Sequence, residues 1–206
     1  MYINNTTNNN ISYTALPKKY KVVDNYLIRG PHPNISDIFQ LKKEGINQIY
    51  DFRHYGLNGF KWVERLACKA VGIEYIRKPY SFIEHMYPTL EEYETISKAV
   101  KENGEKGGMA LFHCNSGTHR TSLMAAFFKI TKGKPLEECK NNENFNEIVN
   151  DAVEEEITNS RFFSRNKVDT NTKNPLKLMK NTFNNKVEEV TRKAYDMFMD
   201  MMKKDV

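Results

Sequence analysis

The sequence predicts an α/β domain in which a central sheet is flanked by helices, followed by a helical C-terminal extension. Strand-like and helix-like segments alternate from about residue 18, as in α/β domains. An apolar strand, "GGMALFH", passes through a short polar loop straight into an apolar helix. With 206 residues, 39% of them hydrophobic, the chain can bury one ordinary core. One domain with an extension is therefore favoured over two domains.

The first elements follow in order along the chain. "YKVVDNYLIRG" has the pattern of two short strands around a turn at Asp24 and Asn25. "NISDIFQLKKEG" predicts an amphipathic helix with Ser36 as its N-cap. "INQIYDF" predicts a strand, residues 58–71 a helix and residues 73–76 an extended segment.

The later elements include the two longest helices. In "PTLEEYETISKAVKENG", Thr89 and Glu92 have the spacing of a capping box before an apolar periodicity. The strand "GGMALFH" and a helix after Arg120 come next. Apolar residues then recur in steps of three and four over residues 175–203, a helix of roughly 40 Å. We expect this helix to pack on the preceding domain, with dimerisation or docking on another protein as alternatives.

Three segments are expected: a disordered leader over residues 1–17, the α/β domain over 18–140 and the helical extension over 141–206. The leader is rich in Asn and Thr and lacks the pattern of a signal peptide, and no run reaches transmembrane length. The three cysteines have neither disulfide nor zinc spacing, so reduced thiols and a cytoplasmic location are expected. They are Cys68, Cys114 and Cys139.

The charge of the chain is mildly positive. Lys and Arg number 31 against 26 Asp and Glu, and the formal net charge is +5. Because both signs are spread along the chain, most of this charge predicts a solvated surface, and nucleic acid is not expected as a partner. A membrane is not expected either, because Glu and Asp interrupt the polar face of the C-terminal helix. A positive excess also suits an anionic substrate.

The loop in "MALFHCNSGTHRTSLMAAFF" carries the most chemical information. A loop that enters a helix directs unpaired backbone N–H groups towards one point, and the helix dipole adds positive potential there. A glycine allows the backbone to curl tightly around an anion. The residues expected to bind the anion are Asn115, Ser116, Gly117, Thr118, His119 and Arg120.

Cys114 opens this loop and is the candidate nucleophile. The helix dipole and Arg120 both favour a thiolate at this position. The planar guanidinium of Arg120 can hold two phosphoryl oxygens, and the Thr121 hydroxyl can stabilise the sulfur. A cysteine at the end of a buried strand is commonly a small apolar filler. Here the strand, the glycine, the arginine and the helix are together the parts that one anion-binding loop needs. The catalytic interpretation is therefore favoured, with His113 as a supporting residue.

"HCNSGTHRT" resembles the H-C-x5-R-[ST] signature of the cysteine-dependent protein tyrosine and dual-specificity phosphatases, especially the small atypical dual-specificity phosphatases. The stretch "VVDNYLIRGPHPNISDIFQLKKEGINQIYDFR" is similar to that family as well, so the resemblance covers about residues 20–138. It implies a phosphatase-type α/β fold, attack of Cys114 on phosphorus, phosphate binding by Arg120 and a phosphocysteine intermediate. It implies no metal and no cofactor.

The sequence offers several candidates for the general acid. The family has an Asp on a loop about thirty residues before the cysteine, whereas "KPYSFIEHMYPT" occupies that place here and contains no Asp. Glu84 is the best substitute, His85 is the next, and an ordinary solvated loop is the remaining alternative. Asp51 also lies near the active edge of the predicted sheet, but a hydrogen-bonded strand-end carboxylate is the favoured interpretation.

Substrate specificity has two interpretations. Aromatic side chains could form walls around a phosphotyrosine ring, which favours phosphotyrosine or mixed phosphoprotein substrates. These are Tyr55, Tyr80, Phe82 and Tyr87. A ring of basic side chains could instead accept an inositol phosphate. These are Arg53, His54, Lys61, Lys78 and His85. A phosphate-binding module with weak or no catalysis and, more remotely, a rhodanese-like sulfur carrier remain as other functions.

Overall fold

The chain folds around a five-stranded sheet. The structure is a computed structural model that describes residues 16–54, 61–81, 86–155 and 175–203, and in the last range it describes side chains from residue 189 onward. The strand order is β1-β2-β5-β3-β4. The strands are β1 (Lys21–Asp24), β2 (Leu27–Pro31), β3 (Ile46–Arg53), β4 (Glu74–Tyr80) and β5 (Met109–Cys114).

Four strands run parallel, and β1 pairs antiparallel with β2 at one edge. Pro31 is in register with Cys114, and Arg53 with Tyr80. The carboxyl ends of β2, β5, β3 and β4 therefore share one edge of the sheet. Ligands of open α/β sheets bind at this edge, and the predicted loop begins there.

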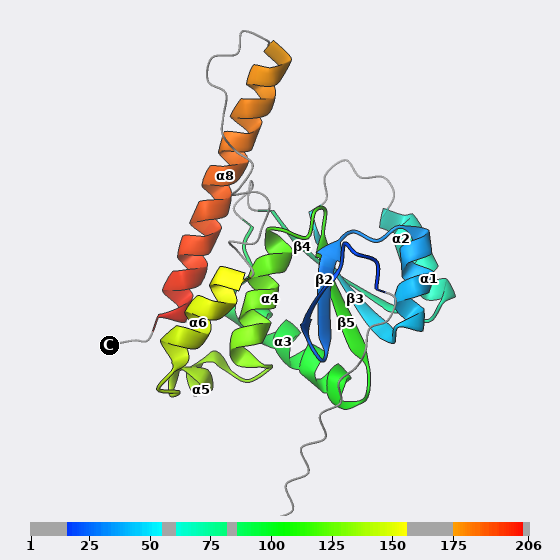
Figure 1. Cartoon of the computed structure of the whole chain (residues 1–206), viewed down its shortest axis with the longest axis horizontal. Coiled ribbons are helices and arrows are strands. Elements are labelled where there is room, and N and C mark those ends of the chain that lie inside the picture. The colour runs from blue at the N-terminus through cyan, green and yellow to red at the C-terminus, as the bar shows by residue number, and fades with distance from the viewer. Residues whose placement is uncertain (1–15, 55–60, 82–85, 156–174, 204–206) are drawn as a thin grey trace, which may run out of the picture.

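Helices cover both faces of the sheet, as the sequence predicted (Figure 1). On one face lie α1 (Ile35–Lys43) and α2 (Lys61–Ala70). The other face carries α3 (Leu90–Glu105), α4 (Arg120–Thr131), α5 (Leu136–Lys140), α6 (Phe145–Val153) and the end of α8 (Pro175–Met202).

Alternation along β5 divides the core in two. Phe112 and Cys114 belong to the cluster under α3 and α4, whereas Leu111 belongs to the cluster under α1 and α2. His113 contacts Glu64 of α2, so it points to the same side as Leu111. The neighbouring residues Cys114 and His113 therefore face opposite sides of the sheet.

The helix caps confirm one prediction and correct another. Thr89 caps α3 in a reciprocal capping box with Glu92. Ser36 is not the cap of α1, because Asn34 takes that position and forms a capping box with Asp37. Asn and Ser are similarly good N-caps, and the carboxylate three residues after Asn34 decides in its favour.

The end of α8 belongs to the main core. Val190, Ala194, Phe198 and Met202 recur every fourth residue and are all buried, and the rings of Phe198 and Tyr93 are 5.8 Å apart. This is the packing expected for the C-terminal helix, whereas its first half projects beyond the sheet and its covering helices (Figure 1). None of the described helices is long and apolar enough to cross a bilayer.

Candidate active site

Residues 114–120, here called the anion loop, connect β5 to α4. Gly117 has a φ of +74°, and its N–H donates to Cys114 Sγ at 3.3 Å. A Cβ atom on Gly117 would lie 2.4 Å from the carbonyl carbon of Gly30. The loop therefore requires glycine here for two reasons, the left-handed backbone and the close approach of β2.

Cys114 is fully buried at the start of the loop. Burial alone would raise the pKa of its thiol, but the positive charge of Arg120 and hydrogen bonds from Thr121 and Gly117 lower it to about 7. The thiolate is therefore accessible near neutral pH. A thiolate is the nucleophilic form of cysteine.

Arg120 is fixed at the first position of α4. Its Nη1 donates to Phe52 O at 3.1 Å and to Tyr80 O at 2.9 Å, at the carboxyl ends of β3 and β4. These two carbonyls hold the guanidinium over the edge of the sheet. Its Nε and Nη2 groups can then donate to two oxygens of one anion.

Two residues that the sequence did not single out support the loop from outside. Arg29 is buried in β2, and its Nη1 donates to Gly117 O at 2.9 Å. The Nδ1 of His32 lies 3.2 Å from Asn115 O. These contacts join residues 88 and 83 positions apart, so no local pattern could predict them.

The other predicted anion-binding residues all lie in the loop. Asn115 and Ser116 are exposed, and Ser116 Oγ lies 2.7 Å from Thr118 Oγ1. Burial and the nearby Arg120 lower the pKa of His119 to about 4, so this imidazole is neutral at pH 7. Within the loop, the positive charge therefore comes from Arg120.

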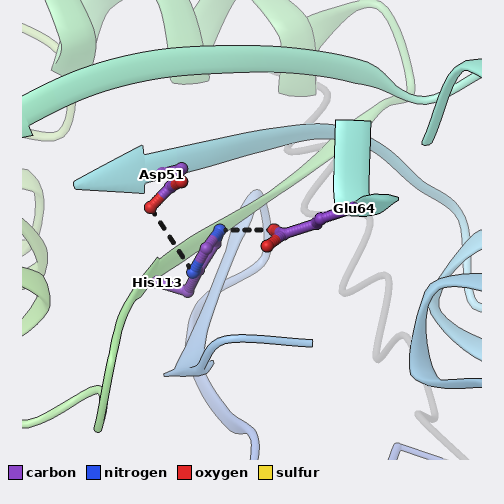
Figure 2. Close-up of side chains that lie close together, drawn as sticks. All are labelled: Asp51, Glu64 and His113. Carbon is purple, nitrogen blue, oxygen red and sulfur yellow. Dashed lines mark ion pairs between the residues drawn. The ribbon is translucent and has the colours of Figure 1, made fainter. Parts of the chain in front are cut away.

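Behind the loop lies a buried charge network of four side chains, Asp51, Arg53, Glu64 and His113. His113 Nε2 lies 2.9 Å from Glu64 Oε1, and its Nδ1 lies 3.9 Å from Asp51 Oδ1 (Figure 2). Arg53 donates two hydrogen bonds of 2.7 Å to the two Asp51 oxygens. Its Nη2 also contacts Glu64. Three separate elements, β3, α2 and β5, are therefore tied together beneath Cys114.

The network balances its own charge. Burial alone would lower the pKa of His113, but the adjacent carboxyl groups of Glu64 and Asp51 raise it above the ordinary value. Burial would raise the pKa of Asp51, but Arg53, His113 and the Tyr75 hydroxyl lower it to about 2. Two acidic side chains thus lie against two basic ones. Asp51 is the hydrogen-bonded carboxylate that the sequence favoured, and a proton donor near pH 7 needs a much higher pKa.

Asp51, Glu64 and His113 are also residues of the kind that bind metals, and their nearest ligand atoms lie within 4.8 Å of one another. The Arg53 guanidinium, however, contacts both carboxylates. It already supplies the positive charge that a metal ion would bring. This donor set therefore fits a closed ion-pair network better than a metal centre.

The predicted specificity residues are only partly at the site. Tyr80 is buried and stacks on Phe52, and Tyr87 packs against the core. Arg53 belongs to the charge network, and it also lines a cavity of about 340 Å³ together with Lys61 and His32. His54 accepts a hydrogen bond from Lys61 through its carbonyl, and Lys78 is half-buried on β4. Tyr55, Phe82, Glu84 and His85 lie outside the described residues.

The other two cysteines lie away from the loop. Cys68 is buried in the cluster under α1 and α2, on the opposite face from Cys114, and burial raises its pKa to about 12. Cys139 Sγ lies 3.7 Å from Thr131 O, at the far end of α4. Neither residue shares the environment that ionises Cys114.

No protein-family model matches the chain, and no curated protein matches its sequence. Solved structures do match its fold. The crystal structure of PTPMT1 superposes on this chain with a TM-score of 0.52 at 16% identity, over 86% of this chain and 99% of that one. PTPMT1 in complex with PI(5)P superposes with a TM-score of 0.50 at 17% identity, over 85% of this chain and 99% of that one. TpbA of P. aeruginosa in complex with pTyr gives 0.45 at 16% identity, over 71% and 83%.

The strand order, the anion loop between β5 and α4 and the similarity to PTPMT1 agree with one another. The chain therefore has the fold of the cysteine-dependent protein tyrosine and dual-specificity phosphatases.

Proposed function

We propose that this protein is a cysteine-dependent phosphatase that hydrolyses phosphomonoesters through a phosphocysteine intermediate. One observation carries the proposal: an ionisable thiol and an anchored guanidinium face one loop of backbone N–H groups. Cys114 has a pKa of about 7, and Arg120 is held by two carbonyls at the edge of the sheet. The similar fold of PTPMT1 supports it.

The proposed reaction has two displacements at phosphorus. The Cys114 thiolate forms an S–P bond as the ester P–O bond breaks, and the departing oxygen takes a proton from a general acid. Water then gives a proton back to that group and attacks phosphorus as the S–P bond breaks, which releases inorganic phosphate and regenerates the thiolate. Arg120 and the loop N–H groups hold the phosphoryl oxygens throughout, and Thr121 stabilises the leaving sulfur.

Glu84 is the proposed general acid. It belongs to the segment between Ser81 and Met86. The N–H of Ser81 donates to the carbonyl of Met86 at 3.0 Å, and the N–H of Met86 donates to the carbonyl of Ser81 at 2.7 Å. Ser81 follows Tyr80, whose carbonyl accepts from Arg120. Both ends of the segment are thus anchored near the guanidinium that would bind the phosphoryl group, which supports a role for Glu84.

Two substrate classes fit such a site. Phosphotyrosine or mixed phosphoprotein substrates are the first proposal. A phosphorylated inositol headgroup is the second, and the cavity lined by Lys61 and His32 favours it because these side chains can meet further anionic groups. PTPMT1 in complex with PI(5)P is an example of such binding in a similar fold. Parallel assays with a phosphotyrosine peptide and a soluble phosphoinositide separate the two classes.

Hydrolysis of p-nitrophenyl phosphate tests the enzyme against the alternative of a phosphate-binding module. We expect Cys114→Ser to abolish turnover while phosphate-analogue binding survives, because a serine hydroxyl is not ionised near pH 7. Arg120→Lys should lower the rate of hydrolysis by orders of magnitude, since an ammonium cannot hold two phosphoryl oxygens in a fork. Cys139→Ser and Arg65→Lys are the matched controls and should keep full activity. A Cys114→Ser rate within tenfold of wild type would refute the proposal.

A further inference from the structure

Helices α1 and α2 lie side by side on one face of the sheet (Figure 1). Their inner sides are typical of a protein core. Ile38 and Leu41 of α1 and Cys68 of α2 are fully buried in one cluster against the sheet. The opposite sides of both helices face solvent.

These outer sides carry large apolar residues. Ile35 and Phe39 on α1 are 50% and 51% exposed, and Trp62 and Leu66 on α2 are 63% and 55% exposed. Each pair has the i, i+4 spacing that aligns side chains on one helix face. Single exposed apolar residues are ordinary, but four on two adjacent helices form a patch of the kind that contacts a partner.

The exposed charges on the two helices have one sign. The exposed charged residues of the two helices are Lys42, Lys43, Arg65 and Lys69. Both helices also contain one acidic residue, and both of these are buried. Asp37 pairs with Lys19 and the cap of α1, and Glu64 lies in the charge network. The face formed by α1 and α2 therefore shows apolar and basic side chains together.

We propose that this α1/α2 face docks on the surface of an anionic lipid bilayer. Apolar side chains with an aromatic among them can insert at the headgroup boundary while Lys and Arg meet lipid phosphates and carboxylates. Tryptophan is enriched at this depth of the membrane. A protein partner is less favoured because lysine is depleted at the centre of protein interfaces. The docking does not depend on the proposed phosphatase activity.

The position of the face also suits the site. Ile35 and Trp62 stand in the first turns of their helices, at the sheet edge where the anion loop begins. Ile35 also lines the cavity that contains His32, and His32 contacts the loop at Asn115. A docked molecule would thus have its cavity next to the lipid headgroups.

Trp62 is the one tryptophan in the sequence, so its fluorescence reports on this face alone. The probes are vesicles of phosphatidylcholine with and without phosphatidylserine, which is a phosphodiester and not a phosphomonoester. We expect the full chain to sediment with the serine-containing vesicles, with a blue shift of Trp62 emission that is lost as salt is raised. Cys114→Ser should bind equally well. The proposal is overturned if no vesicle shifts Trp62, or if Cys114→Ser abolishes binding.

Variants that keep Trp62 locate the contact. Phe39→Ser with Leu66→Ser should weaken vesicle binding by at least about tenfold, and so should Arg65→Ala with Lys69→Ala. The matched controls are Met197→Ser, which removes an equally exposed apolar residue from α8, and Lys98→Ala with Lys193→Ala. Circular dichroism melting verifies that each variant is folded. Equal losses of vesicle binding in the variants and in the controls overturn the proposal. A shift of Trp62 emission that rises with protein concentration in the absence of lipid would indicate self-association and would overturn it as well.

Discussion

His113 Nε2 and Glu64 Oε1 lie 2.9 Å apart in the interior, where a strand of the sheet meets the inner side of α2. His113 directly precedes the nucleophile, and its Nδ1 lies 3.3 Å from the carbonyl of Cys114. Glu64 therefore fixes an imidazole that in turn contacts the backbone of the anion loop. Removing one member of such a buried pair leaves an uncompensated charge.

Glu64→Gln should destabilise the fold by about 3 to 5 kcal/mol. A raised pKa means that the His113–Glu64 contact stabilises the fold fully below the unfolded value of 6.5, and that this contribution is lost as pH rises through the folded pKa. The loss in the variant should therefore be larger at pH 5.5 than at pH 8.5. Urea unfolding at both pH values measures it.

Glu102→Gln is the matched control for this experiment. Glu102 forms an exposed i, i+4 pair with Lys98 at 3.9 Å, and its loss should cost under about 1 kcal/mol at either pH. If Glu64→Gln costs the same at both pH values, His113 is not a protonated partner of Glu64.

The pH dependence of activity should report the Cys114 thiolate. A pKa lowered to about 7 places the thiolate above that pH and the thiol below it, so kcat/KM should fall as pH drops through 7. Thr121→Val removes a hydroxyl that helps to lower the pKa of Cys114 and should move this acid limb upward by about one pH unit. Ser122→Ala removes the next buried hydroxyl and should leave the limb in place. If the acid limb of the pH profile shifts equally in both variants, the shift comes from changed packing of α4 and not from the Thr121 hydroxyl.

Gly117→Ala should disable the anion loop. The added Cβ would lie 2.4 Å from the backbone of β2 at a positive φ, so the loop must shift and the N–H to Sγ contact is lost. We expect kcat/KM to fall by orders of magnitude. Gly45→Ala introduces a side chain at φ +89° with no atom within 4 Å, so it should cost about 1 to 2 kcal/mol of stability and no activity. Full activity in Gly117→Ala would mean that the loop can open away from β2.

Peroxide should inactivate the enzyme without forming an internal disulfide. An ionised thiol is readily oxidised to sulfenic acid. Cys68 lies on the other face of the sheet, and Cys139 lies beyond the far end of α4, a helix about 16 Å long from Arg120 to Thr131 at 1.5 Å per residue. A disulfide needs Cα atoms within about 7 Å. Mass spectrometry should find added oxygen on Cys114, and recovery with thiol should persist in Cys68→Ser with Cys139→Ser. A Cys114 disulfide with either residue would contradict this geometry.

The sequence predicted the fold class and the anion loop because both have local signals. Strand periodicity, the Thr89 capping box and the spacing of Cys114 and Arg120 lie within short stretches of chain. Arg29, His32 and Glu64 had no such signal, since their partners come from other elements. Arg53 was expected to line the pocket and does line the cavity, but its ion pairs with Asp51 and Glu64 had no local signal either.

The exposed α1/α2 face also had no local signal. The expectation of no membrane partner rested on the C-terminal helix, whose polar face is interrupted by Glu and Asp, and it stays a prediction. Once the helices form, Asp37 and Glu64 turn inward and the basic residues remain outside. Charge that is balanced in sequence is therefore separated in space.

Glu84→Gln tests the proposed general acid. If Glu84 donates a proton to the leaving oxygen, the variant should slow hydrolysis of a phosphotyrosine peptide far more than that of p-nitrophenyl phosphate, because only the poorer leaving group needs protonation. The acid limb near pH 7 reports Cys114 and should remain, whereas the basic limb, which reports the acid, should disappear. His85→Gln is the matched control in the same segment. Equal losses on both substrates would show that Glu84 shapes the segment between Ser81 and Met86, and a selective loss in His85→Gln would transfer the role to the imidazole.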